Sequence, residues 1–213
     1  MKLASFIEHT ILGAACTKED VENKCSEALQ HGFYSVCVPP YWVSHAAQIL
    51  EEKPPKVVTV IGFPLGYSAT AAKVEEIKRA IDDGVDEVDV SINICAVKEG
   101  NWSYVYNDIN SVTTAAHLRG KVVKIILETD LLTSEEIKKT CKICMELDTD
   151  FVKTSSGKNG TGVSVEHIQF LKTLLTKKVK IQASGGIRSK EVAQQLLEAG
   201  AHRIGTSSGL DFI

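Results

Sequence analysis

One lysine of the chain lies where a charged side chain is costly. Lys153 is in the middle of the short apolar segment FVKTSSG, and in a strand it would share a face with Phe151 and Ser155. A buried lysine must be paired, neutral or functional, because burial strips water from its charge. Two interpretations stay open at this point: an ion pair with Asp89 or Glu128, or an amine kept neutral enough to attack a carbonyl and form a Schiff base.

Two other segments group polar residues on one face of a predicted strand. In DEVDVSIN the apolar residues alternate with a polar set, Glu87, Asp89, Ser91 and Asn93. In KVVKIILE the same alternation groups Lys124 with Ile126 and Glu128. If the apolar faces meet helices, the acids point into the interior of a barrel; taken alone, DEVDVSIN is equally compatible with a solvated edge strand.

Clusters of glycine and hydroxyl residues follow the last three predicted strands: SSGKNGTG (155–162), SGGIRS (184–189) and GTSSG (205–209). Small residues let backbone N–H groups approach a ligand, and a following helix N-terminus adds positive potential. Each cluster alone is weak evidence, but two in succession near the end of the chain favour a phosphate site.

The elements that must position these residues alternate along the whole chain. We expect strands at residues 5–10, 33–38, 56–62, 86–92, 121–127, 150–155, 178–183 and 202–207. Helical segments separate them, and their starts are marked by Thr17, by Thr133 with Glu136, and by Ser189. Glycines that suit left-handed helix ends follow three of these segments, at Gly32, Gly84 and Gly200.

This alternation predicts an α/β fold with a parallel sheet, and its eight rounds favour a closed (β/α)8 barrel, the TIM barrel, built from a single domain over residues 1–213. An open doubly wound sheet is the second choice. A dinucleotide-binding version of that sheet would carry GxGxxG after its first strand, and the sequence has no such motif there.

Composition limits the classes of partner. The chain is 44% hydrophobic and 24% charged with a formal charge of -3, so we expect a globular protein with no basic face for nucleic acid. We find neither a signal-peptide core nor an apolar run that could cross a membrane, which predicts a cytoplasmic protein. The six cysteines are then reduced thiols, and the CxxC of Cys141 and Cys144 is better explained as two neighbours on a helix than as a metal or redox site.

Eight segments together resemble the deoxyribose-phosphate aldolases, a family of class I aldolases, along nearly the whole chain. They are IEHTIL (7–12), SVCVPP (35–40), VVTVIGFPLG (57–66), DEVDVSIN (86–93), KIILETDLLT (125–134), FVKTSSG (151–157), ASGGIR (183–188) and RIGTSSG (203–209). The resemblance implies a (β/α)8 barrel that reversibly cleaves 2-deoxy-D-ribose 5-phosphate into acetaldehyde and D-glyceraldehyde 3-phosphate. It implies no metal and no organic cofactor.

The resemblance also implies roles for individual residues. Lys153 matches the Schiff-base lysine, Asp89 matches the acid that moves protons together with a water, and Cys37 matches a cysteine that lines the pocket. Other positions match the part of the site that holds the substrate and its phosphate: Glu8, Thr154, Gly157, Lys158, Gly185, Gly186, Gly205, Ser207 and Ser208.

Two positions depart from the family pattern. Gln182 stands where a second lysine is usual, and Glu8 stands where an aspartate is usual. The second lysine lowers the pKa of the Schiff-base lysine, so its loss is expected to reduce the neutral amine roughly 100- to 1000-fold at pH 7. We expect Lys124, or else Lys180, to compensate in part, and a small effect from Glu8.

Three functions therefore compete. The leading one is an active aldolase; the second is a silent barrel that binds sugar phosphates, for which Gln182 is the sole support. A Schiff-base enzyme for another aldehyde or keto acid comes third. Small molecules are the expected partners, and association of copies through outer helices is open, with Trp102, Tyr104 and Tyr106 as a candidate patch.

Overall fold

The strands form a closed barrel. The computed structural model describes residues 2–176 and 178–213, in which eight parallel strands pair in chain order and β8 pairs with β1. The strands are β1 (Ile7–Thr10), β2 (Ser35–Val38), β3 (Lys56–Ile61), β4 (Glu87–Ser91), β5 (Val122–Ile126), β6 (Phe151–Lys153), β7 (Lys180–Ser184) and β8 (Arg203–Thr206). The predicted barrel is confirmed, and the open sheet is wrong.

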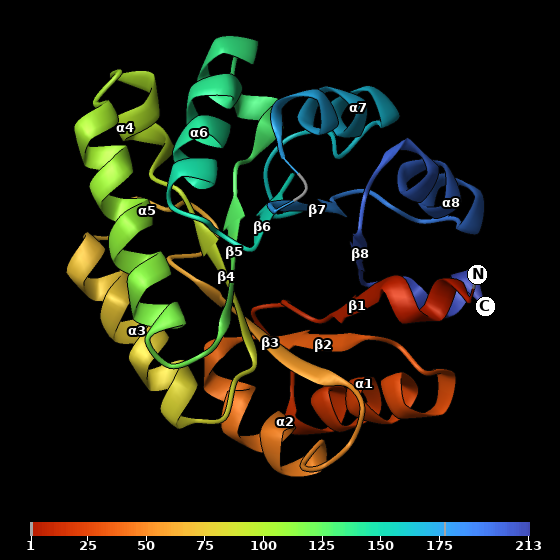
Figure 1. The fold of residues 1–213 in the computed structure, drawn as a ribbon. Helices are drawn as coiled ribbons and strands as arrows, with labels where there is room; N and C mark the ends of the chain where they lie inside the picture. The colour runs from red at the N-terminus through yellow and green to blue at the C-terminus, as the bar shows by residue number, and fades with distance from the viewer. Residues whose placement is uncertain (1, 177) are drawn as a thin grey trace.

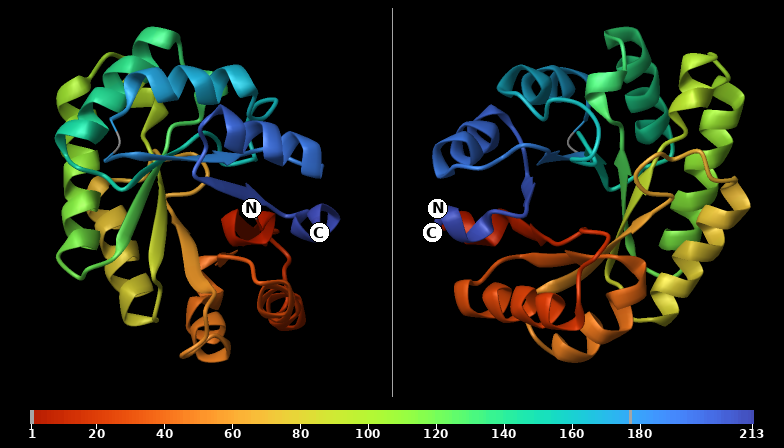
Figure 2. Two further views of the ribbon diagram at one scale, coloured as in Figure 1. Left: turned by 45° about the vertical axis from the view of Figure 1, so that its right-hand side comes forward. Right: turned by 180° about the vertical axis from the view of Figure 1, so that it is seen from behind.

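Helices surround the strands (Figures 1 and 2). They are α1 (Lys18–His31), α2 (Val43–Ile49), α3 (Thr70–Asp82), α4 (Ile94–Lys98), α5 (Trp102–His117), α6 (Ser134–Glu146), α7 (Val165–Leu174) and α8 (Lys190–Ala199). The connection from β4 to β5 holds two of them, α4 and α5. Both termini lie together beside β8 and β1, where the barrel closes (Figure 1).

The predicted helix starts are confirmed. The Thr17 and Thr133 side chains each accept a hydrogen bond from the third residue of the following helix, whose own carboxylate accepts from the cap backbone. Ser189 caps α8 in the simpler way, by accepting from the backbone of Val192. Gly32 ends α1 in the left-handed conformation, with φ of 71°.

The first predicted strand was too long. Residues 3–6 form a short 3-10 helix, and β1 begins at Ile7. The hydroxyl of Ser5 donates to the carbonyl of Lys2 at 2.9 Å, which closes a turn just before the strand. Local turn chemistry therefore outweighs the β-propensity of Phe6. The other predicted strands differ from the observed ones by one or two residues at their ends.

Apolar side chains pack mainly between the strands and the helices. The inside of the barrel has a second, smaller apolar cluster formed by Cys37, Val58 and Val60 of β2 and β3, against which Leu12 and Phe63 pack. The remaining strands contribute mostly polar and charged side chains to the interior. One side of the barrel interior is therefore apolar, and the other holds the polar and charged side chains.

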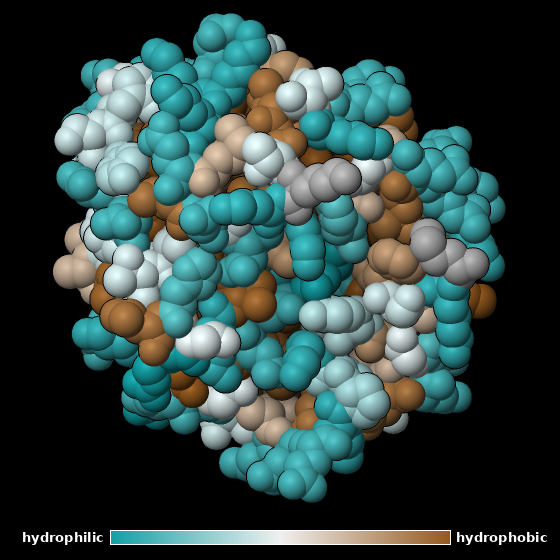
Figure 3. Space-filling model, viewed as in Figure 1, coloured by the Kyte–Doolittle hydropathy of each residue, from teal (hydrophilic) through white to brown (hydrophobic). Residues whose placement is uncertain are grey.

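Hydrophilic side chains predominate on the face shown in Figure 3, with hydrophobic ones dispersed among them. Among the residues that the structure describes, every helix is too short or too polar to cross a bilayer.

A buried ion pair outside the barrel fixes the end of β4. The ammonium of Lys73 on α3 donates to the carboxylate of Asp108 on α5 at 2.7 Å and to the carbonyl of Ser91 at 2.9 Å. The hydroxyl of Thr70 donates to the other Asp108 oxygen at 2.7 Å. Both charged side chains are almost fully buried, so each depends on the other for charge compensation.

Replacing Lys73 alone should therefore destabilise the protein strongly. We expect Lys73→Met to cost about 3–5 kcal/mol of unfolding free energy, because Asp108 is left buried without its cation. Lys73→Met with Asp108→Leu should recover most of this loss. Urea unfolding measures both, with the exposed pair of Arg79 and Asp83 as the control, whose loss should cost less than about 1 kcal/mol. Equal losses for the two pairs would contradict the prediction.

Candidate active site

Six charged side chains from five strands meet inside the barrel, none of them more than 6% exposed. The alternation of each strand turns them inward: Glu8 of β1, Glu87 and Asp89 of β4, Lys124 of β5, Lys153 of β6 and Arg203 of β8. The predicted inward orientation of the β4 acids is confirmed, and the solvated edge strand is wrong. Three acids and three bases balance, so the cluster is neutral as a whole.

Lys153 lies at the end of this cluster that faces the carboxyl ends of the strands, and it contacts two carboxylates. Its ammonium donates to Asp89 and, at 3.1 Å, to Oε1 of Glu8. The ion pair that the sequence left open as an alternative is therefore present with Asp89. It does not exclude the Schiff-base role, because the carboxylate that binds the ammonium can also accept its proton.

Lys124 lies within the same cluster. It forms ion pairs with Glu8, with Glu87 at 2.9 Å and with Asp89 at 3.0 Å. Glu87 in turn pairs with Arg203, whose guanidinium stacks 3.7 Å from the ring centre of Tyr34. Lys124 thus lies close enough to the partners of Lys153 to compensate in part for the lysine that is absent at position 182.

Lys180, the other residue considered for compensation, does not reach the cluster. It is exposed at the start of β7, with its ammonium 5.5 Å from the ring centre of Phe151. Its side chain shares the strand face of Gln182, but the strand rise carries it to the opposite end of the barrel.

The carboxylates decide the protonation of Lys153. Burial by itself disfavours the ammonium, but Asp89 and Glu8 outweigh burial and raise the pKa of Lys153 above its usual value. The two carboxylates therefore favour the ammonium form of Lys153 in the free site, because they lie closer than the pattern alone could show. The role of Lys153 as an attacking amine stays a prediction. Burial and the charge of Glu8 raise the pKa of Asp89, which makes it the readier of the two acids to accept a proton.

Gln182 and Cys37 complete the surroundings of Lys153. Gln182 is opposite Lys153 in the β6–β7 register, and its amide nitrogen donates to Oε1 of Glu8 at 2.6 Å. Cys37 is buried, and burial together with the charge of Glu8 raises the pKa of its thiol well above the usual value. The thiol is thus a neutral part of the wall beside the lysine.

The same neighbours include a potential set of metal ligands. Among the described residues, Glu8, Cys37 and Asp89 offer ligand atoms within 4.8 Å of one another. The ammonium groups of Lys124 and Lys153 already contact both carboxylates. A metal cation would have to displace them, so the cluster is better suited to amine chemistry.

A cavity of about 520 Å³ opens above Lys153. It lies at the carboxyl ends of the strands, where barrel enzymes place their active sites. Seven of the predicted site residues line it: Lys153, Gly157, Lys158, Gly185, Gly186, Gly205 and Ser207. Glu8, Cys37, Asp89 and Gln182 lie buried in the barrel interior instead.

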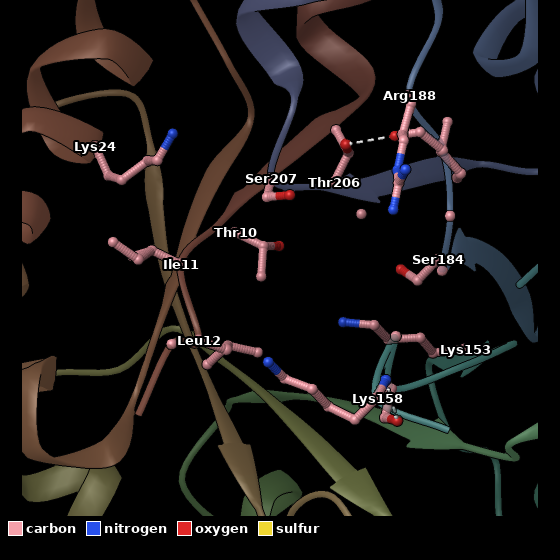
Figure 4. A pocket seen from close by; sticks show the side chains of 17 residues that line it. Thr10, Ile11, Leu12, Lys24, Lys153, Lys158, Ser184, Arg188, Thr206 and Ser207 are labelled. Carbon is pink, nitrogen blue, oxygen red and sulfur yellow. Dashed lines mark hydrogen bonds between the residues drawn. The ribbon is translucent and has the colours of Figure 1, made fainter. Parts of the chain in front are cut away.

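Arg188 and Ser207 lie on one side of this cavity, and Lys158 lies across from them beside Lys153 (Figure 4). The side chains of Arg188 and Lys158 extend from the loops after β7 and β6, and Ser207 follows β8. Gly185 and Gly186 both have positive φ, of 99° and 71°, which favours glycine and exposes backbone N–H groups. This side of the cavity suits an anion such as a phosphate.

Glycine at position 205 keeps the cavity floor open. A Cβ there would collide with the hydroxyl of Ser184 and approach the amide nitrogen of Gln182 to 2.9 Å. Only glycine therefore lets β8 pass this close to the polar side chains of β7.

Two acids hold the loop after β6. The carboxylate of Asp130 accepts from the backbone of Thr161 at 2.6 Å and of Gly162 at 2.9 Å. Glu128 accepts from the hydroxyl of Ser155 at 2.6 Å. Glu128 as the ionic partner of Lys153 is therefore wrong: the chain leaves β5 at Ile126, and Glu128 has a φ of 56° that turns it towards the loop.

Besides Glu8 and Cys37, two further predicted substrate-binding residues, Thr154 and Ser208, lie outside the cavity lining. The hydroxyl of Thr154 donates to the carbonyl of Ser184 at 2.9 Å and accepts from its N–H at 3.0 Å, so it joins β6 to β7. Ser208 begins the short 3-10 helix η4 (Gly209–Phe212), and its N–H donates to Thr206.

The lining residues that were not singled out from the sequence include four with polar or charged side chains: Thr10, Lys24, Ser184 and Arg188. Arg188 and Ser184 flank the glycine pair in SGGIR, so their neighbourhood was a usable signal. Lys24 is in the middle of α1, where its ammonium contacts Glu27 at 3.0 Å, and helix periodicity gave no indication of a site. Only the three-dimensional structure identifies Lys24 as a lining residue, because it shows that the β1–α1 connection and α1 reach the cavity.

Comparisons with known proteins agree with this geometry. The family model described as DeoC/LacD family aldolase matches residues 3–213. The chain is 46% identical over 215 residues to the deoxyribose-phosphate aldolase of Thermococcus gammatolerans, with 100% of this chain and 96% of the relative covered. It is 47% identical over 214 residues to the enzyme of the same name from Thermococcus kodakarensis, again covering 100% of this chain and 96% of the relative.

Solved structures give the same result. The tetrameric deoxyribose phosphate aldolase of Aeropyrum pernix superimposes with a TM-score of 0.92 and 32% identity, over 99% of this chain and 88% of that one. A 4-hydroxy-tetrahydrodipicolinate synthase from Methylacidiphilum fumariolicum superimposes with a TM-score of 0.69 at 13% identity, over 97% of this chain and 69% of that one, and shares the fold alone.

The cysteines differ in their access to reagents. Cys95 is exposed and Cys16 is partly exposed, whereas four are buried, Cys25, Cys37, Cys141 and Cys144. Burial raises the pKa of Cys144 to about 12 and that of Cys141 further. We find no sign of thiolate character in the CxxC pair, as the helix-face interpretation predicts.

We expect thiol reagents to follow this division. Iodoacetamide at pH 8 should label Cys95 and Cys16 in the native protein and the four buried cysteines only after unfolding, because the thiolate is the reactive form. Peptide mass spectrometry of native and denatured samples measures this. Native labelling of Cys37, or a disulfide between Cys141 and Cys144, would contradict it.

Proposed function

The chain belongs to the DeoC/LacD family of aldolases, and we propose from this premise that it reversibly cleaves 2-deoxy-D-ribose 5-phosphate into D-glyceraldehyde 3-phosphate and acetaldehyde. Relatives named deoxyribose-phosphate aldolase, similar over their full length, support this substrate. We also propose that the protein works in the cytoplasm, with small molecules as its partners. The tetrameric relative supports assembly from copies of the chain.

One observation carries the proposal: a single cavity offers an amine and an anion site at opposite sides. In Figure 4, Lys153 lies across the cavity from Arg188 and from Ser207, which follows β8, and Lys158 extends beside Lys153. A substrate with an aldehyde at one end and a phosphate at the other satisfies both. The phosphate contacts supply binding energy that positions the reacting carbon.

The reaction begins with proton transfer in the ion pair. Lys153 passes a proton to Asp89, whose raised pKa makes it the acceptor. The neutral amine adds to the C1 aldehyde, and the positively charged nitrogen then passes a proton to the new alkoxide oxygen, which gives a neutral carbinolamine. Asp89 returns its proton to the departing hydroxyl group, which leaves as water, and the lysine nitrogen becomes a positively charged iminium.

Carbon–carbon cleavage uses the same two residues. The ionised Asp89, with a water, takes the proton of the C3 hydroxyl, the C2–C3 bond breaks, and its electrons move to the iminium nitrogen. D-Glyceraldehyde 3-phosphate leaves. Asp89 then protonates the enamine carbon, and hydrolysis releases acetaldehyde from Lys153.

Borohydride trapping tests the proposal directly. Reduction in the presence of 2-deoxyribose 5-phosphate should fix an adduct on Lys153, because borohydride reduces the iminium; peptide mass mapping locates it. Lys153→Met should form no adduct and lose at least about 1000-fold in turnover. An unmodified Lys153 in protein that binds the sugar phosphate would favour the silent sugar-phosphate-binding barrel instead.

Arg188 should act on the phosphate end alone. We expect Arg188→Met to raise KM for 2-deoxyribose 5-phosphate about 10- to 100-fold, the equivalent of a lost charge-assisted hydrogen bond. Cleavage of 2-deoxyribose without phosphate should be unchanged, and steady-state kinetics on both sugars measures the difference. Equal losses on the two sugars would place Arg188 outside the phosphate site.

A further inference from the structure

Glu8 and Asp89 both face Lys153, but their other contacts differ. Oε1 of Glu8 accepts from Lys153 at 3.1 Å and from Gln182 at 2.6 Å, and its Oε2 accepts from Lys124. The donors come from three different strands, β5, β6 and β7. Glu8 is therefore fixed in place, with both oxygens committed to donors.

Gln182 contributes a neutral donor to this arrangement. It is fully buried, and its amide nitrogen lies between the strand of Lys153 and that of Arg203. An amide orients the carboxylate without adding a charge that would compete with Lys153 for it. Gln182 thus fixes the oxygen that faces the lysine nitrogen.

The reaction needs two different things from the acids beside Lys153. One acid must gain and lose protons, and Asp89 does so in the steps derived above. The lysine nitrogen is also positively charged just after it has added to the aldehyde, when Asp89 still holds the proton that it took from the ammonium. At that stage Asp89 is neutral and cannot balance the charge on the nitrogen, so a second, ionised acid is needed.

We infer that Glu8, oriented by Gln182, is the permanent counter-ion of the Lys153 nitrogen, which leaves Asp89 free to carry the proton. This inference rests on the proposed function of the site. Glu8 touches the reacting nitrogen, and Gln182 is a positioning residue that acts through Glu8. The departures from the family pattern at positions 8 and 182 are then one hydrogen-bonded unit.

Electrostatics supports this division. Although burial favours the protonated acid, Lys124, Lys153 and Arg203 hold the pKa of Glu8 well below its usual value. Burial and Glu8 itself raise the pKa of Asp89. One acid therefore stays ionised and the other is ready to accept a proton.

Glu87 provides a matched control. It is buried in the same cluster and pairs with Lys124 and Arg203, and Tyr34 donates to it at 3.2 Å. It has no contact with Lys153 among those that the described residues make. Glu8→Gln and Glu87→Gln therefore remove the same buried charge, but only one removes it from the lysine.

The test is borohydride trapping of the acetaldehyde imine on Lys153 as a function of pH. Six charged or titratable groups surround the nitrogen or its partners: Glu8, Cys37, Glu87, Asp89, Lys124 and Arg203. Loss of the negative Glu8 lowers the pKa of Lys153 and of its iminium. In Glu8→Gln we expect the profile to move about one unit to lower pH and its maximum to fall about tenfold.

Glu87→Gln should move the profile by less than about 0.3 unit, because its charge acts on Lys153 only at a distance. Equal shifts in the two variants, or no shift in Glu8→Gln, would overturn the inference. If circular dichroism shows that Glu8→Gln does not fold, Glu8→Asp replaces it in the test. Because Glu8→Asp retains the charge, the pH profile should keep its position while the trapping rate falls. A shifted profile would overturn the inference.

Gln182→Leu tests the positioning role. It should slow trapping about three- to tenfold in the wild-type background and have no further effect in Glu8→Gln, because the residue it orients is gone. Independent effects that multiply would contradict a role through Glu8. Trapping of acetaldehyde requires no carbon–carbon cleavage, so protein that forms this adduct without cleaving 2-deoxyribose 5-phosphate would disprove the proposed function and still decide the role of Glu8.

Discussion

The mutual neutralisation of six buried charges is the interaction on which the rest of the site depends. Each of these ions would cost several kcal/mol if buried alone, and each is tolerated because ions of the opposite charge lie within hydrogen-bonding distance. The partners come from strands that are far apart in sequence, so the cluster exists only when the barrel closes. The charge balance therefore links the site to folding, and a change in one member shifts most strongly the pKa values of the members that it contacts.

The barrel also separates two tasks along its axis. The deep part of the interior holds the charges, opposite the apolar side formed by β2 and β3. The loops at the carboxyl ends of the strands line the cavity, and they are held by side chains from neighbouring loops, as Asp130 and Glu128 hold the loop after β6. The geometry at Lys153 is thus set by strands, whereas the recognition of the distant anion is set by loops.

The sequence predicted the parts of this design that follow from local rules. Strand alternation placed Asp89 and Lys153 inside the barrel, and capping residues marked the starts of α1, α6 and α8. It failed where two segments must be seen together. The alternation of β5 predicted that Glu128 points into the barrel, but the chain turns before this residue. The raised pKa of Lys153 depends on the contact with Glu8, which comes from the other end of the chain.

The same reasoning changes the meaning of Gln182. If only Lys153 is considered, the absence of a lysine at position 182 leaves the pKa of Lys153 high, so that too little of the amine is neutral. A cation at position 182 would, however, lower the pKa of Asp89 as well as that of Lys153, because both lie in the same cluster. The first chemical step moves a proton between these two groups, so it depends on the difference between their pKa values and not on either alone. With a neutral amide at position 182 instead of a lysine, the pKa values of Lys153 and Asp89 are both higher, and their difference changes less than either value. The proton transfer from Lys153 to Asp89 is therefore slowed less than the smaller amount of free amine suggests.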